Sequence, residues 1–151
     1  MLKFLVSIDG TENSLPAVHH VTRLKSENVS LSVVLLYVHY EPTPFGAVTG
    51  GMTPERIKAL KAEMSDEVFA KAEALLKRAG IEYSREFRVA EDVASEIARM
   101  AREKGCDAIV MGTHRGRSVV KTFAGSTASK AIQLAEVPVT VIAEKEEARA
   151  A

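Results

Sequence analysis

The 151-residue sequence lacks the features that mark secreted, metal-binding and membrane-spanning proteins. Its single cysteine, Cys106, cannot form an internal disulfide, and no Cys/His cluster has the spacing of zinc ligands. No apolar run approaches the roughly 18 residues of a membrane span, and the apolar start of the chain is too short for a signal peptide. We therefore expect a cytoplasmic protein without a structural metal, in which Cys106 is an inert, partly buried thiol.

Net charge is also missing. Twenty basic and twenty acidic residues cancel and are interspersed along the chain, so neither nucleic acid nor a membrane surface is indicated as a partner. The length fits one domain over residues 1–151, which would bury about 68 to 70% of its unfolded surface. The last residues, 143–151, are charged and alanine-rich, and we expect them to fray.

What the sequence does contain is a regular alternation of short apolar runs with longer segments of helical period. The runs predict strands at residues 2–8, 29–38, 81–89, 108–111 and 137–142, and the periodic segments predict helices at about 14–25, 53–80, 92–105 and 126–134. The second run is rich in β-branched residues, as in a strand covered on both faces. The third alternates apolar with polar residues, which places it at a sheet edge. Residues 39–52, rich in proline and glycine, are expected to form a mobile loop.

Strands that alternate with helices indicate an α/β fold with a parallel sheet and helices on both of its faces. Right-handed connections leave few arrangements, and we expect a doubly wound five-stranded sheet of order 3-2-1-4-5. In such a sheet ligands bind where the strand order reverses, between strands one and four, beside the carboxyl ends of the strands. Those ends carry residues 9–11 and 112–113.

The stretch GTHRGRSVVKTFAGST, residues 112–127, follows the fourth strand and has the composition of a phosphate-binding loop. Gly112, Gly116 and Gly125 allow left-handed or crowded backbone that can aim N–H groups at a phosphate. The last helix begins at Gly125-Ser126, and its first N–H groups and its dipole attract anions. Other side chains of the stretch that could contact a phosphate are Arg115, Arg117, Ser126 and Thr127. The glycines are equally compatible with an ordinary turn, and they match neither the Walker loop nor G-x-G-x-x-G.

Together, four stretches resemble the universal stress protein family: LVSIDGTENSL, LLYVH, DAIVMGTHRGRS and AGSTASKAIQLAEVPVTVI. The resemblance covers nearly the whole chain. It implies the same doubly wound fold, a crevice that holds ATP or AMP, and pairing of two copies through the fifth strand. It also implies that Asp9 meets the adenine or ribose, that Val38 packs against the adenine, and that ribose and phosphates lie near the glycines. The nucleotide-binding residues expected on this basis are Ser7, Ile8, Asp9, Val38, Met111, Gly112, His114, Arg115, Gly116, Arg117, Gly125, Ser126 and Thr127.

The glycine spacing departs from the pattern of the nucleotide-binding members of that family, which is G-x2-G-x9-G-[ST]. Here the glycines fall at Gly112-x3-Gly116-x8-Gly125, so that Arg115 stands where the second glycine is expected. The span from the first to the last glycine is unchanged. Both ends of the loop can therefore keep their places, while Arg115 alters its middle.

Two of these residues have a second interpretation. Asp9 could cap the turn or helix that follows it, and His114 is a conceivable general base. Because no acid or nucleophile is fixed beside His114 in the sequence, we expect no catalytic residue.

We expect a regulatory module of the stress response that binds ATP or AMP, acts as a homodimer through residues 137–142, and is not an enzyme. Magnesium could accompany ATP, and a protein partner is possible. Two alternatives stay open, a slow ATP hydrolase and a nucleotide-independent dimeric stress scaffold.

Overall fold

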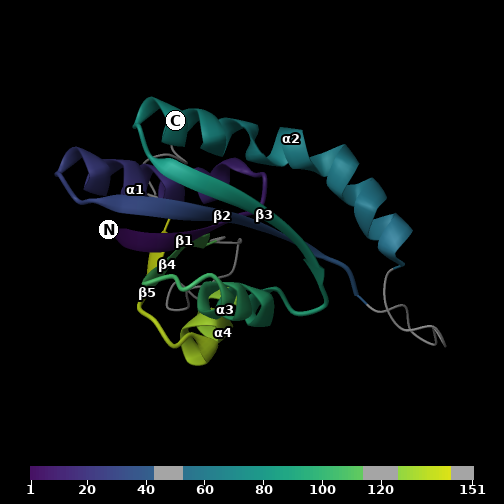
Figure 1. Cartoon of the computed structure of the whole chain (residues 1–151). Coiled ribbons are helices and arrows are strands. Elements are labelled where there is room, and N and C mark those ends of the chain that lie inside the picture. The colour runs from purple at the N-terminus through teal and green to yellow at the C-terminus, as the bar shows by residue number, and fades with distance from the viewer. Residues whose placement is uncertain (43–52, 114–125, 144–151) are drawn as a thin grey trace, which may run out of the picture.

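The computed structural model describes residues 1–42, 53–113 and 126–143, except for the side chains of residues 64 and 65. Within these ranges, five strands and four α-helices alternate in chain order (Figure 1). The strands are β1 (Leu2–Ile8), β2 (Leu31–Tyr40), β3 (Glu82–Ala90), β4 (Ala108–Thr113) and β5 (Val139–Ala143). The α-helices are α1 (Leu15–Ser26), α2 (Pro54–Arg78), α3 (Val93–Glu103) and α4 (Ser126–Leu134). A 3₁₀ turn, η1 (Glu12–Ser14), precedes α1.

The strands form one parallel sheet in the order β3-β2-β1-β4-β5, which confirms the predicted doubly wound fold. The chain adds β2 and β3 on one side of β1 and then returns to add β4 and β5 on the other. In this register Ile8 lies opposite Tyr37, and Ser7 lies opposite Met111. The carboxyl ends of β1, β2 and β4 therefore lie side by side, at the same end of the parallel strands.

Helices cover both faces of the sheet, and each face has its own apolar core (Figure 1). Helices α1 and α2 pack on one face, where Phe4 and Val6 of β1 are buried. Helices α3 and α4 pack on the other, where Leu5 is buried. Both Leu35 and Leu36 of β2 are inaccessible to solvent, which confirms a strand covered on both faces.

Most helix ends follow the sequence signals. The Thr53 hydroxyl accepts from the Arg56 N–H at 3.2 Å, and the Asp92 carboxylate accepts from the Ser95 N–H at 3.2 Å, as N-caps do. Gly80 has a φ of 68°, the left-handed conformation predicted after α2. The start of α1 differs, because the Ser14 hydroxyl donates to the Thr11 carbonyl at 2.8 Å and caps no helical N–H. The 3₁₀ turn before α1 brings that carbonyl within reach.

Four strands, β2 to β5, end one or two residues after their predicted limits, because pairing continues past the apolar runs. Strand β3 spans Glu82–Ala90 instead of 81–89, and β2 begins at Leu31 instead of residue 29. Strand β2 continues to Tyr40, which was predicted to lie in the loop 39–52. Tyr40 belongs to the strand because it pairs with Ala90 of β3. Strand β4 continues to Thr113, which pairs with Ala143. Ala143 was assigned to the fraying tail, but it is the last residue of β5, and β5 begins at Val139 instead of residue 137. Residues 144–151 lie outside the described part.

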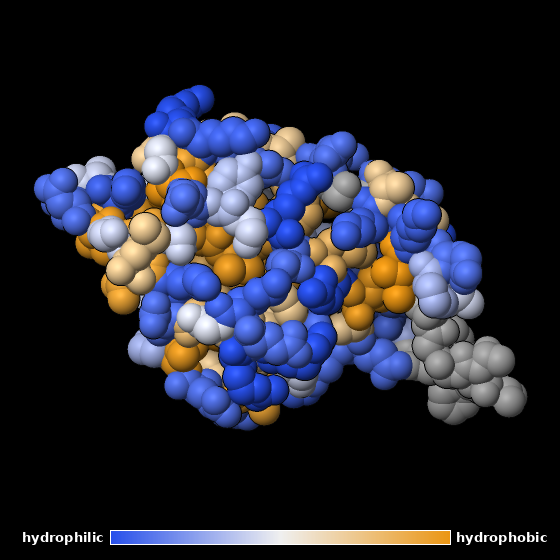
Figure 2. All heavy atoms as spheres, viewed as in Figure 1, coloured by the Kyte–Doolittle hydropathy of each residue, from blue (hydrophilic) through white to orange (hydrophobic). Residues whose placement is uncertain are grey.

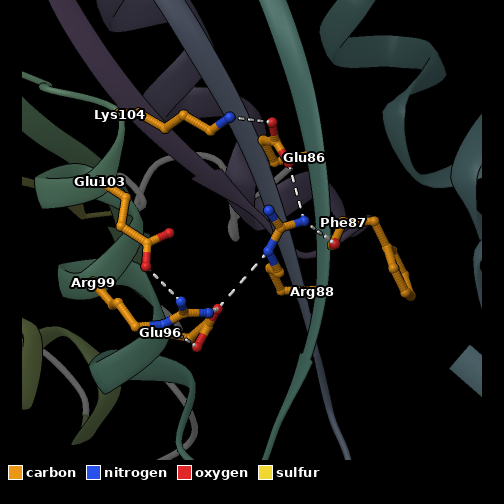
Figure 3. Close-up of polar contacts among 7 residues, drawn as sticks. All are labelled: Glu86, Phe87, Arg88, Glu96, Arg99, Glu103 and Lys104. Atoms are coloured by element: carbon orange, nitrogen blue, oxygen red, sulfur yellow. Dashed lines mark hydrogen bonds and ion pairs between the residues drawn. The ribbon is translucent and has the colours of Figure 1, made fainter. Parts of the chain in front are cut away.

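Helix α3 is tied to the edge strand β3 by ion pairs (Figure 3). The Lys104 ammonium lies 2.8 Å from a Glu86 carboxylate oxygen, and the Arg88 guanidinium lies 3.0 Å from the other. Arg88 also reaches Glu96 of α3 at 4.0 Å. The helix is thus held on the sheet by charges at its margin and by apolar residues beneath it.

The face shown in Figure 2 is largely hydrophilic, with apolar residues gathered in separate areas. In the part of the chain that the structure describes, no helix combines the length and the apolarity that crossing a bilayer takes. Cys106 is buried, and burial raises the pKa of its thiol, in agreement with an inert role.

Candidate functional site

A cavity of about 480 Å³ opens at the carboxyl ends of β1, β2 and β4. Its volume lies in the range of small-molecule sites. Its position is the point where the strand order reverses, as in other doubly wound sheets that bind ligands. The first turns of α3 and α4 form its side walls.

One part of the cavity is apolar. Val38 from β2, Met111 from β4 and two residues of α3, Val93 and Ile97, line it together. These side chains come from three elements that are distant in the sequence, and they belong to, or pack against, the core between the sheet and helices α3 and α4. A surface of this kind can accept a flat apolar ring such as a nucleobase.

Asp9 lies at the end of β1 and lines the cavity while it holds the turn that follows. Its Oδ1 accepts from the Thr11 N–H at 2.9 Å and from the Thr11 hydroxyl at 2.6 Å. Gly10 between them has a φ of 80°, which favours glycine. The turn-holding role that we considered for Asp9 is therefore present, and the same contacts fix the carboxylate at the cavity.

Three residues at the end of β2 form a chain of polar contacts beside the cavity. The Tyr37 hydroxyl lies 3.1 Å from His39 Nδ1, and His39 Nε2 lies 3.2 Å from a Glu41 carboxylate oxygen. In the neutral ring that donates Nε2–H to Glu41, Nδ1 accepts from the Tyr37 hydroxyl. Burial, followed by the charge of Asp9, raises the pKa of Tyr37 and keeps this donor protonated.

Gly112 is required by a close backbone approach. A Cβ atom at this position would lie 2.4 Å from the Asn13 carbonyl oxygen. Positive φ values among the described glycines fall on Gly10, Gly80 and Gly105, so Gly112 supplies no left-handed conformation. Of the two conditions expected for this glycine, left-handed or crowded backbone, the structure has the crowded one, because the 3₁₀ turn η1 leaves no room for a side chain.

The side wall from α4 is the first turn of that helix, where Ser126, Thr127 and Ala128 line the cavity. The first N–H groups of a helix have no partner within the helix, and the helix dipole makes this end positive. With two hydroxyl side chains beside them, these N–H groups can bind an anion such as a phosphate.

The structure gathers eight of the thirteen predicted site residues around the cavity: Ser7, Ile8, Asp9, Val38, Met111, Gly112, Ser126 and Thr127. The other five, His114, Arg115, Gly116, Arg117 and Gly125, lie outside the described residues.

Thr113, which the sequence places at the end of the fourth strand, also lines the cavity. Sequence reasoning missed the other lining residues: Asn13, Ser14, Tyr37, His39, Tyr40, Val93, Ile97 and Ala128. Only their position in the sequence could have indicated them. Each lies near the carboxyl end of a strand or in the first turns of a helix, on the side of the sheet where the strands end.

No group of three or more His, Cys, Asp or Glu residues in the described ranges could hold a metal ion. The cavity therefore combines an apolar surface, a fixed carboxylate and a helix N-terminus, with no metal-binding cluster among those residues. These are groups that bind and orient a ligand with an apolar ring at one end and an anion at the other.

The model of the universal stress protein family matches residues 1–143 of the chain. A search of curated proteins found no match. Among solved structures, a member of that family from Burkholderia pseudomallei is 28% identical, with a TM-score of 0.67; the alignment covers 93% of this chain and 94% of that chain.

Two further similar structures hold an adenine nucleotide. A universal stress protein from Archaeoglobus fulgidus in complex with dAMP is 19% identical, with a TM-score of 0.64, and 94% of this chain and 98% of that chain are covered. A family member from Arabidopsis thaliana with AMP bound is 15% identical, with a TM-score of 0.68, and 97% of this chain and 94% of that chain are covered. At these identities the similarity concerns the fold.

Proposed function

The chain belongs to the universal stress protein family, and we propose on this basis that it is a regulatory module that binds AMP or ATP in the cavity at the carboxyl ends of β1 and β4. The observation that carries the proposal is that Asp9, the first turn of α4 and an apolar surface line one cavity. Relatives of the same fold with bound AMP and dAMP support it. We further propose that the protein acts in the cytoplasm and is not an enzyme.

The chemistry of the walls orients the nucleotide. The adenine ring lies against Val38 and Met111, where the ring loses contact with water. Asp9 accepts hydrogen bonds from the ribose or from the adenine amino group. The phosphates lie at Ser126 and Thr127, where helix N–H groups and hydroxyls donate to them.

With ATP, a magnesium ion would be held mainly by phosphate oxygens and water. Protein sites for Mg²⁺ of this kind add one or two carboxylates at most. Because Asp9, the carboxylate among the described lining residues, is assigned to the ribose or adenine, the ion would depend on the phosphates and on water. The described residues supply no larger acidic cluster that could hold the ion without a nucleotide.

Calorimetric titration with AMP, ATP and GTP tests the proposal. We expect binding of the adenine nucleotides, and we expect AMP or ATP to be among the small molecules extracted from protein purified without added nucleotide. Absence of heat at millimolar AMP and ATP would contradict the proposal and favour the nucleotide-independent scaffold.

The variant Ser126→Glu locates the phosphates. A carboxylate in the first turn of α4 favours the helix through its dipole but repels a bound phosphate. We therefore expect AMP and ATP to bind at least tenfold more weakly, while adenosine binds as before. The matched control is Gln133→Glu, which adds the same charge near the other end of α4. Equal affinity of both variants for AMP would place the phosphates elsewhere.

We also propose that two copies associate through β5. This strand is at one edge of the sheet and is half-buried, and the exposed apolar residues Ile132 and Leu134 of α4 precede it. The other edge strand, β3, carries charged side chains such as Glu82, Arg85 and Arg88, which discourage pairing between edges. The charged edge strand β3 is thus protected against pairing, whereas the uncharged edge strand β5 is free to pair with a second chain.

A further inference from the structure

We propose that Asp92 and Lys130 are positioning residues, which hold the first turn of α4 at the distance from α3 that lets it contact a phosphate. This inference rests on the proposed nucleotide binding. It concerns two residues outside the cavity lining, which act through the helices that form its two side walls.

The ion pair joins these walls directly. Asp92 is the N-cap of α3, and Val93, the next residue, lines the cavity. Lys130 lies in α4 one turn after Ser126 and Thr127, and its ammonium group donates to Asp92 Oδ2. The contact therefore bridges the start of α3 and the middle of α4, and its Asp92 directly precedes the cavity-lining Val93.

The two walls are anchored to different degrees. Helix α3 buries Ile97 and Met100 and is also tied to β3 by the ion pairs of Lys104 and Arg88 (Figure 3). Helix α4 buries only Ala128 and Ala131 among its residues. Alanine buries little apolar surface, and the free energy of burial scales with that surface. The position of α4 consequently depends more on polar contacts than the position of α3 does.

The charges of Asp92 and Lys130 agree with a role in positioning α4. The ammonium group of Lys130 and the hydrogen bonds from Ser95 lower the pKa of Asp92 to about 2, which shows that these contacts favour the ionised carboxylate. The Lys130 charge is then matched by a carboxylate within the protein. A lysine held in this way orients the helix that carries it and is not primarily a phosphate ligand.

The test compares AMP with adenosine in calorimetric titrations of the whole chain. The variants are Lys130→Met and Asp92→Asn, the second of which keeps an N-cap for α3. An exposed ion pair of this kind predicts that each variant binds AMP roughly two- to fivefold more weakly. Adenosine should bind unchanged, because it has no phosphate to reach α4. Lys130→Arg should restore the AMP affinity.

Arg102→Met is the matched control. Arg102 lies 3.9 Å from Glu136 and joins the far ends of α3 and α4, away from the cavity. It should leave AMP and adenosine affinity unchanged, with a melting temperature close to those of the two test variants.

Three outcomes would overturn the inference while leaving the proposed function intact. The first is unchanged AMP affinity in Lys130→Met and Asp92→Asn. The second is an equal loss for AMP and adenosine, which would indicate a general effect on the fold. The third is tighter AMP binding by Asp92→Asn, which would make Lys130 a phosphate ligand that Asp92 restrains. If the unmodified protein binds no AMP, the proposed function fails and this inference fails with it.

Discussion

At the scale of single residues, the predicted ligand-binding positions also have visible structural roles. Asp9 holds the turn after β1 through Thr11, and Gly112 admits the backbone of Asn13. Such double roles explain why residue type alone could not decide between a turn and a binding site. The decision requires the rest of the cavity wall, part of which the fold brings from the start of α4.

The close approach at Gly112 gives a prediction for stability. Gly112→Ala places a methyl group 2.4 Å from the Asn13 carbonyl oxygen, and backbone must move to relieve the contact. We expect a loss of about 1–3 kcal/mol in the free energy of unfolding, as for overpacking elsewhere. Urea denaturation measures it.

The control for this change is Gly105→Asn. Gly105 has a φ of 64° and open space around its would-be Cβ, and asparagine tolerates left-handed backbone better than most residues. A stability loss at Gly105 as large as that at Gly112 would contradict the steric explanation.

At the scale of elements, the sequence predicts what periodicity and caps encode. Strand β2 was recognisable because its apolar, β-branched residues are buried on both faces, and Thr53 and Asp92 marked the starts of α2 and α3 correctly. The continuation of β2 to Tyr40 was not recognisable, because it depends on pairing with Ala90 of β3. Pairing partners are set by tertiary structure and leave no local signal.

The same limit applies to the cavity. Residues next to a recognisable turn or glycine, such as Asp9 and Ser126, could be predicted. Tyr37 and Ile97 could not be, since one looks like an ordinary strand residue and the other like the apolar face of a helix. They become site residues only because the strand order places the ends of β2 and α3 beside β1.

The contact between α2 and β3 allows a prediction at this scale. The Arg85 guanidinium lies 5.3 Å from the centroid of the Phe69 ring and donates to Glu73 at 2.7 Å and Asp66 at 3.0 Å. Arg85→Met removes the cation–π contact with Phe69 and the ion pairs with Glu73 and Asp66. The half-buried Glu73 then loses the positive charge of Arg85. We expect the free energy of unfolding to fall by about 1–2 kcal/mol.

Chemical denaturation at low salt measures the effect of Arg85→Met, and Arg78→Met at the exposed end of α2 is the control. Because salt screens ion pairs, the difference between the two variants should shrink in 1 M salt. A stability of Arg85→Met equal to that of the control would show that the Arg85 contacts do not hold α2 on β3.

At the scale of the whole molecule, the proposed dimer depends on the difference between the two sheet edges. Thr140→Lys places a charge on β5, the edge without charged side chains, and should weaken association by disfavouring strand pairing. Ser84→Lys makes the same kind of change on β3 and should leave the oligomeric state unchanged. Sedimentation velocity over a range of protein concentrations gives the masses. A dimer that persists in Thr140→Lys but dissociates in Ser84→Lys would assign the interface to β3.

The asymmetry of the edges has a consequence for the stoichiometry of any assembly. A sheet with two adhesive edges can add a neighbour at each end and grow into a polymer of open length. This sheet has charged side chains along β3 and an uncharged strand at β5. Once two copies join β5 to β5 about a two-fold axis, both remaining edges are charged, and growth stops at two chains.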